Sequence, residues 1–109
     1  MSDKEVISKI DFSDSNFNML KQGKKTTVRL DEEEFSLGEA LLVKVASKDV
    51  IRAEITEVRK LRFGDLGLSD AVADGFNSVS ELRKELEKCY QKPINDYDVV
   101  NVVRFNLIE

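Results

Sequence analysis

The side chains available for chemistry in this chain are limited by what it lacks, since it contains no His, no Trp and a single Cys. Without an imidazole, a Ser-His-Asp or Cys-His hydrolase is excluded. One Cys and no His also exclude the usual zinc sites and an intramolecular disulfide. Any chemistry must use Lys, Arg, Asp, Glu, Ser, Thr, Tyr or backbone groups. The ten-residue segment LKQGKKTTVR, residues 20–29, is the one place where a predicted helix end, a glycine, lysines, two threonines and an arginine occur together.

Composition narrows the class of protein further. The chain has 109 residues, with 17 Lys and Arg against 21 Asp and Glu, which gives a net charge of −4. That balance argues against generic affinity for a phosphate backbone, which needs a basic surface. The length predicts one domain covering residues 1–109. The polar start and the absence of a long apolar run predict a cytoplasmic protein without a membrane span, and nothing indicates a cofactor or a metal.

The elements that must position this segment follow from periodicity and capping signals. Ser78 and Glu81 form a capping box at the start of a helix predicted over residues 79–90, the clearest element of the chain. Apolar and polar residues alternate over 50–58, as in a half-buried strand. The expected order is a strand at 6–12, a helix at 15–22, strands at 26–30, 40–46 and 50–58, a short helix within 61–76, the helix at 79–90, and an inner strand within 97–108. This order predicts an α+β fold around a small, largely antiparallel sheet or barrel.

The ten-residue segment resembles the signature of the ASCH domain family, in which G-x-K-x-x-T/E-x-R marks a junction between a helix and a strand. Counted back from Arg29, Thr27 and Lys24 fit the K-x-x-T-x-R part of this motif, whereas the glycine is displaced by one position, to Gly23. The spacing between lysine and threonine makes Lys24 the first choice for the family lysine. Lys25 remains the alternative.

Further segments extend the resemblance over residues 12–108. They are the turn Phe35 to Glu39, the acid-Gly-Phe sequence Asp74-Gly75-Phe76, the helix from Ser80 to Tyr90, and the closing strand that ends in Arg104-Phe105. The resemblance implies a PUA-like barrel, small, mixed or antiparallel, with five or six strands and two to three helices.

The resemblance also implies a function, because one branch of the ASCH family comprises bacterial amidohydrolases that deacetylate acetylcytidine. By this analogy Thr27 is the nucleophile, Lys24 the base that activates it, and Asp74 the acid that protonates the departing amine. Such a lysine needs a pKa lowered by burial or by nearby cations. Aligned on the following helix, the family acid falls on Gly75, so Asp74 is displaced by one residue.

Three further cations, Lys21, Lys25 and Arg29, are candidates for binding the substrate, and Arg29 is also able to stabilise charge on a carbonyl oxygen. The predicted partner is a nucleoside-type small molecule or RNA. The alternative function is a non-enzymatic module that binds RNA or senses nucleotides, in which these cations and Lys24 contact phosphate. The chain shows no DNA-binding signature, and its oligomeric state stays open.

Other residues have plainer interpretations. Cys89 lies on the apolar face of the 79–90 helix and is predicted to be a core thiol, while the charges of that helix form a mixed, solvated surface. Glu81 belongs to the capping box. The run Asp31 to Glu34 lacks the spacing of a calcium loop and is expected to be solvated, with Arg29 pairing to it as the alternative to a role in the site. Tyr90 and Tyr97 are expected to pack.

Overall fold

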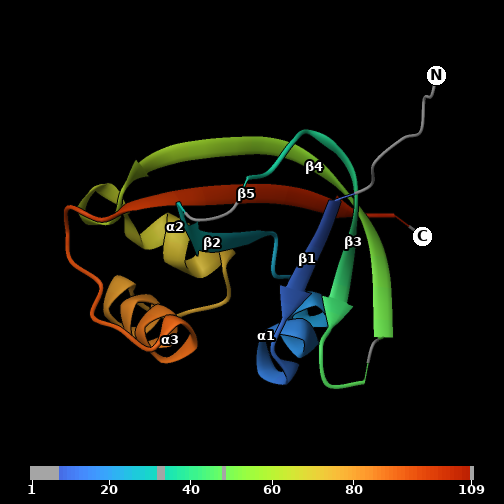
Figure 1. Cartoon of the computed structure of the whole chain (residues 1–109), viewed down its shortest axis with the longest axis horizontal. Coiled ribbons are helices and arrows are strands. Elements are labelled where there is room, and N and C mark those ends of the chain that lie inside the picture. Colours follow the sequence, from blue (N-terminus) through green and yellow to red (C-terminus); the bar gives the residue numbers. More distant parts are fainter. Residues whose placement is uncertain (1–7, 32–33, 48, 109) are drawn as a thin grey trace.

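The chain folds into a five-stranded mixed sheet with three α-helices, in a computed structural model that describes residues 8–31, 34–47 and 49–108. Figure 1 shows the long strands curving over the helices, which lie on one side of the sheet. The strands are β1 (Ser8–Phe12), β2 (Thr26–Leu30), β3 (Gly38–Lys44), β4 (Asp49–Arg62) and β5 (Val99–Leu107), and the helices are α1 (Asp14–Met19), α2 (Leu68–Ala73) and α3 (Val79–Tyr90). Single 3₁₀ turns follow α1, at Leu20–Gln22, and β4, at Phe63–Asp65.

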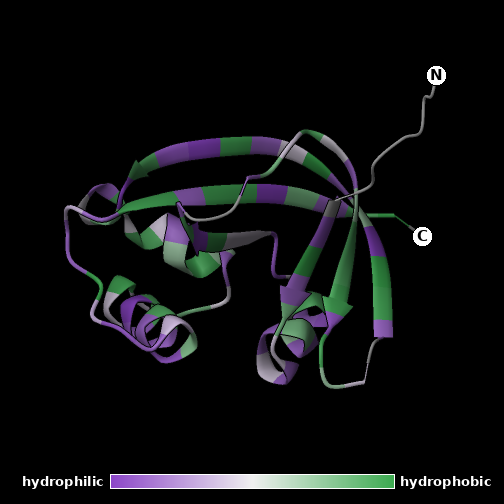
Figure 2. Cartoon of the chain, viewed as in Figure 1, coloured by the Kyte–Doolittle hydropathy of each residue, from purple (hydrophilic) through white to green (hydrophobic). Residues whose placement is uncertain are grey.

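The strand order is β1-β3-β4-β5-β2, with β1 parallel to β3 and the other neighbours antiparallel. A register shift between Ile55 and Glu57 interrupts the pairing of β4 with β5. A bulge of this kind bends a strand and increases its twist, which curls the sheet into a half-barrel. Figure 2 shows hydrophobic and hydrophilic residues alternating along β4 and β5, as expected for strands with one face on the core.

The buried residues form two clusters that divide the molecule. One joins β1, β3 and α1 to the ends of β4 and β5 around Ile10, Phe12 and Phe105. The other joins β2, α2 and α3 to the first half of β5 around Phe63 and Leu82. Because β4 and β5 run through both halves, the two long strands fix the position of α1 relative to α3.

The predicted α+β class, with five or six strands and two to three helices, is confirmed, and most of the expected elements are found. The helix predicted over 79–90 has those bounds, and the one predicted over 15–22 is α1 followed by a 3₁₀ turn. β4 continues to Arg62, beyond the predicted end at residue 58, because it keeps pairing with β5. β3 starts and ends two residues before its predicted bounds. Residues 6 and 7 of the first predicted strand lie outside the described residues.

The outer edge of β2 is covered by side chains, not by another strand. The backbone N–H of Val28 donates to Asp74 Oδ2 at 3.1 Å, and the N–H of Leu30 donates to the Tyr90 hydroxyl at 3.2 Å. Edge N–H groups left unpaired away from water cost free energy and invite pairing with other chains. Asp74 therefore has a structural task in addition to any chemical one. In the described part of the chain, no helix is long and apolar enough to cross a membrane.

Gly75 lets the chain turn directly after Asp74, and its replacement tests how much that turn matters. Its φ is +96°, and an added Cβ would lie 2.7 Å from Met19 Sδ. We expect Gly75→Ala to lower the free energy of unfolding by about 2 kcal/mol. Gly67→Ala is the matched control, because Gly67 has negative φ and an added Cβ meets nothing within 4 Å, so about 0.5 kcal/mol is expected. Urea denaturation measures both, and equal losses would contradict the prediction.

Candidate functional site

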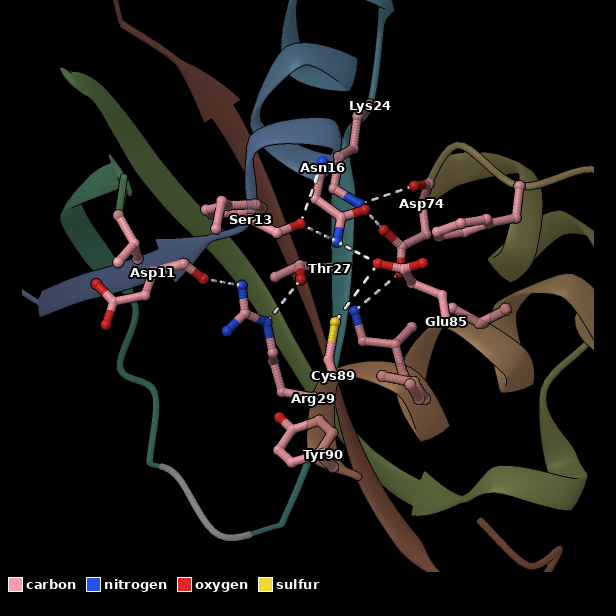
Figure 3. A pocket seen from close by; sticks show the side chains of 16 residues that line it. Asp11, Ser13, Asn16, Lys24, Thr27, Arg29, Asp74, Glu85, Cys89 and Tyr90 are labelled. Carbon is pink, nitrogen blue, oxygen red and sulfur yellow. Dashed lines mark hydrogen bonds and ion pairs between the residues drawn. The ribbon is translucent and has the colours of Figure 1, made fainter. Parts of the chain in front are cut away.

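A pocket of about 440 Å³ opens between α1 and α3, at the boundary between the two halves of the core. Figure 3 shows side chains from β1, α1, β2, α3 and the end of α2 converging on it. Its volume lies within the range of small-molecule sites. The residues that line it are Asp11, Phe12, Ser13, Asn16, Lys24, Thr27, Val28, Arg29, Val45, Asp74, Phe76, Leu82, Glu85, Leu86, Cys89 and Tyr90.

Lys24 reaches the pocket because of the way the α1 segment ends. Gly23 has a φ of +103° and caps the 3₁₀ turn, after which the Lys24 N–H donates to Met19 O at 3.1 Å. The Lys24 side chain then turns inward and is 5% exposed. Its Nζ donates to Asp74 O at 2.7 Å, forms an ion pair with the Asp74 carboxylate, and lies 5.6 Å from the centre of the Phe76 ring.

The environment of Lys24 makes its amine far less basic than that of an ordinary lysine. Burial lowers the pKa of Lys24 from 10.5 to about 7, and the neighbouring Arg29 cation acts in the same direction. The negative charge of Glu85 opposes the shift. A substantial fraction of the Lys24 side chain is therefore neutral at pH 7, which an amine must be to accept a proton.

Asp74 is held in place on both sides. It caps the C-terminal end of α2 and is 3% exposed. One carboxylate oxygen accepts from the Val28 N–H, and the other forms the ion pair with Lys24. Both oxygens are thus engaged within the protein, so Asp74 orients Lys24 and fastens β2 to the end of α2.

Thr27 and Arg29 lie two positions apart on β2 and therefore share one face of the strand. Arg29 Nε donates to Thr27 Oγ1 at 2.9 Å, and Arg29 Nη2 donates to the backbone carbonyl of Asp11 at 2.6 Å. Since Thr27 Oγ1 accepts from a cation, its own proton is available to a base. Lys24 and Thr27 both line the pocket, and in the described part of the chain no direct hydrogen bond joins their side chains.

Four of the six candidate site residues line this pocket, namely Lys24, Thr27, Arg29 and Asp74. Lys21 and Lys25 are exposed and are not among its lining residues. The Lys25 backbone instead bonds to Ala73 O and to the Phe105 N–H. Of the two candidate lysines, the pocket contains Lys24.

Three of the lining residues without a predicted role in the site, Asn16, Glu85 and Cys89, contact one another. Asn16 Nδ2 donates to Glu85 Oε2 at 2.9 Å, and Cys89 Sγ lies 3.4 Å from the same oxygen. The prediction that Cys89 is a core thiol is wrong, because Cys89 is exposed at the pocket. Partial desolvation and the Glu85 carboxylate raise the pKa of Cys89, which favours the neutral thiol. Glu85 follows Leu82 by three residues and precedes Cys89 by four, so helical spacing places the three side chains on one face of α3. That spacing is the sequence signal that could have identified Glu85.

The acidic run at residues 31–34 contributes nothing to the pocket lining. Asp31 forms an ion pair of 2.8 Å with Lys60, and Glu32 and Glu33 lie outside the described residues. Among the described residues, no group of three or more Cys, Asp or Glu side chains is placed to hold a metal ion.

Comparison with solved structures shows an ASCH-like fold. The crystal structure of an ASCH domain from Lactobacillus crispatus matches with a TM-score of 0.69 and 14% identity, covering 92% of this chain and 79% of that one. A protein from Enterococcus faecalis of the DUF984 family matches with a TM-score of 0.69 and 11% identity, covering 97% and 78%. No protein-family model and no curated protein sequence matches the chain.

The lowered pKa of Lys24 is directly measurable. We expect its side-chain NMR signal to titrate with a midpoint near pH 7, with Lys24→Met identifying the signal. In the unfolded chain the same lysine keeps its proton up to about pH 10.5, so the unfolded state binds more protons between about 7 and 10.5. The contribution of Lys24 to stability therefore increases as the pH rises through that window. A midpoint near 10 would contradict the burial argument.

The ion pair between Lys24 and Asp74 predicts a coupled loss of stability. Lys24→Met at pH 6 leaves a buried carboxylate without its cation and should lower the free energy of unfolding by about 3–5 kcal/mol. Adding Asp74→Asn removes that charge and keeps an acceptor for the Val28 N–H, which should recover about 2 kcal/mol. Denaturant titration of the two single variants and the double variant measures the coupling. Additive losses would show that the pair is not coupled.

Proposed function

We propose that this chain is an amidohydrolase that removes the acyl group from acetylcytidine-like nucleosides in the pocket between α1 and α3. The observation that carries the proposal is the buried Lys24, whose pKa of about 7 makes it a base at neutral pH, in the wall that also contains the Thr27 hydroxyl. A threonine attacks a carbonyl only when a nearby base removes its proton. The chain has no His, and Lys24 meets the requirements for that base.

In this reaction Thr27 Oγ1 attacks the acyl carbon while Lys24 takes its proton, directly or through one water. The Arg29 guanidinium, which touches Thr27 Oγ1, stabilises negative charge that develops on the carbonyl oxygen. Lys24 then returns its proton to the departing amine, and the acyl group remains on Thr27. Asp74 acts as a positioning residue for Lys24, because both of its oxygens are engaged within the protein.

The charges around the pocket favour a nucleoside over a phosphate-bearing ligand. Its lining contains two basic side chains, Lys24 and Arg29, together with the carboxylates of Asp11, Asp74 and Glu85. Lys21 and Lys25, which the alternative RNA-binding function would use on phosphate, are not among the lining residues. The apolar and aromatic remainder, including Phe76 and Tyr90, suits a flat base. These features support the enzymatic function over the RNA-binding one.

Thr27 provides the sharpest test of the proposed activity. The purified protein should release acetate from acetylcytidine, with kcat/KM rising as the pH passes about 7 and Lys24 loses its proton. Thr27→Val preserves the shape and removes the hydroxyl, and it should abolish turnover, whereas Thr27→Ser should retain part of it. Lys24→Ala is a poorer test because it breaks a buried ion pair.

Thr56→Val, on the exposed face of β4, is the matched control and should leave the rate unchanged. A folded wild-type protein that turns over none of a panel of acylated nucleosides would refute the proposal. RNA binding that weakens steeply with salt would then favour the alternative function.

A further inference from the structure

We propose that Glu85 is the general base for the second half of the reaction, in which water releases the acyl group from Thr27. This inference rests on the proposed amidohydrolase function and assigns a carboxylate that the ASCH motif does not contain. An acyl-threonine ester must be hydrolysed before the next turnover, and the attacking water must lose a proton. The base that accepts this proton has to face the pocket and have a free oxygen.

Of the carboxylates around the pocket, Asp74 does not meet this requirement. It is 3% exposed, one oxygen holds the Val28 N–H, and the other contacts Lys24. Taking a proton from water would break one of these buried contacts. Asp11 lies at the opposite wall, where its backbone carbonyl, not its side chain, bonds to Arg29.

Glu85 does meet the requirement. Its side chain projects from α3 toward Asn16 across the pocket (Figure 3). Asn16 Nδ2 and Cys89 Sγ both contact Oε2, and among the described residues neither contacts Oε1. A carboxylate oxygen only accepts, so the Asn16 amide must present its NH₂ to Glu85, which fixes the carboxylate and leaves Oε1 for water. Glu85 is also close enough to Lys24 to influence its charge.

The step balances as follows. The water oxygen forms a bond to the acyl carbon, and one water proton moves to the Glu85 carboxylate. The bond between the acyl carbon and Thr27 Oγ1 then breaks, and the proton on Glu85 passes to that oxygen. The products are the free acid and an enzyme with its Thr27 hydroxyl and its Glu85 carboxylate restored. Lys24 serves the first half-reaction and Glu85 the second.

The experiment is a burst assay with acetylcytidine on Glu85→Gln, which keeps the size and an acceptor oxygen but removes the base. Steady-state turnover should fall by about 100-fold. One equivalent of cytidine should appear rapidly, and intact-mass analysis should show one acetyl group per chain, mapped to Thr27. Glu85→Asp, which retains a carboxylate, should restore part of the turnover.

Two controls accompany the assay. Glu54→Gln makes the same chemical change on the exposed face of β4 and should behave as the wild type. Thr27→Val combined with Glu85→Gln should carry no acetyl group.

The outcomes separate the two proposals. If wild-type protein neither turns over nor becomes acetylated, the proposed function fails, and the role of Glu85 fails with it. If the wild type is active and Glu85→Gln either keeps full turnover or loses it without accumulating acetyl-Thr27, only the assignment of Glu85 is overturned.

Discussion

The buried contact between Lys24 and Asp74 is the interaction on which the site and much of the local fold depend. It joins the residue that follows the α1 segment to the end of α2, and the same carboxylate holds the edge of β2 through Val28. A buried ion pair is a weak source of net stability, because desolvation offsets the attraction. Here the contact matters because it fixes the position of the Lys24 amine, whose pKa is lowered by burial. Replacing either partner lowers the free energy of unfolding, so a change to the candidate site at this contact also changes the stability of the fold.

The position of the pocket follows from the division of the core into two clusters. α1 packs in the cluster around Phe12, α3 packs in the cluster around Leu82, and the pocket opens at the boundary between them. β4 and β5 extend through both clusters, and the bulge near Ile55 sets their curvature. The distance across the pocket is therefore determined by two strands whose own side chains take no part in it. This arrangement places the side chains of Thr27 and Arg29 on a rigid strand, which suits groups that must keep a fixed orientation.

Local signals were enough to predict α3, whose capping box at Ser78 and Glu81 and whose helical spacing lie within the helix itself. The end of β4 was missed because its pairing beyond residue 58 depends on β5, some forty residues later. Cys89 was misassigned for a related reason. Periodicity shows which residues share a helix face, but not that this face meets a pocket. The motif spacing favoured Lys24 over Lys25, and the structure gives the physical reason: after the turn at Gly23, with its positive φ, Lys24 is buried and Lys25 is exposed.

A displacement of one residue explains why the proposed reaction assigns different tasks to Asp74 and Glu85. Alignment with the resembled family places its acid on Gly75, but that position has a φ of +96° and contacts Met19, so a carboxylate there would be strained. Asp74, one residue earlier, ends α2 and directs its oxygens to the backbone and to Lys24. Asp74 therefore holds Lys24 in position, but neither of its oxygens is available to accept a proton from water. Glu85, half-buried and oriented by Asn16, has the opposite environment. Different surroundings commonly give two carboxylates of one site different tasks, and in the proposed reaction Asp74 positions the base while Glu85, on α3, transfers the proton.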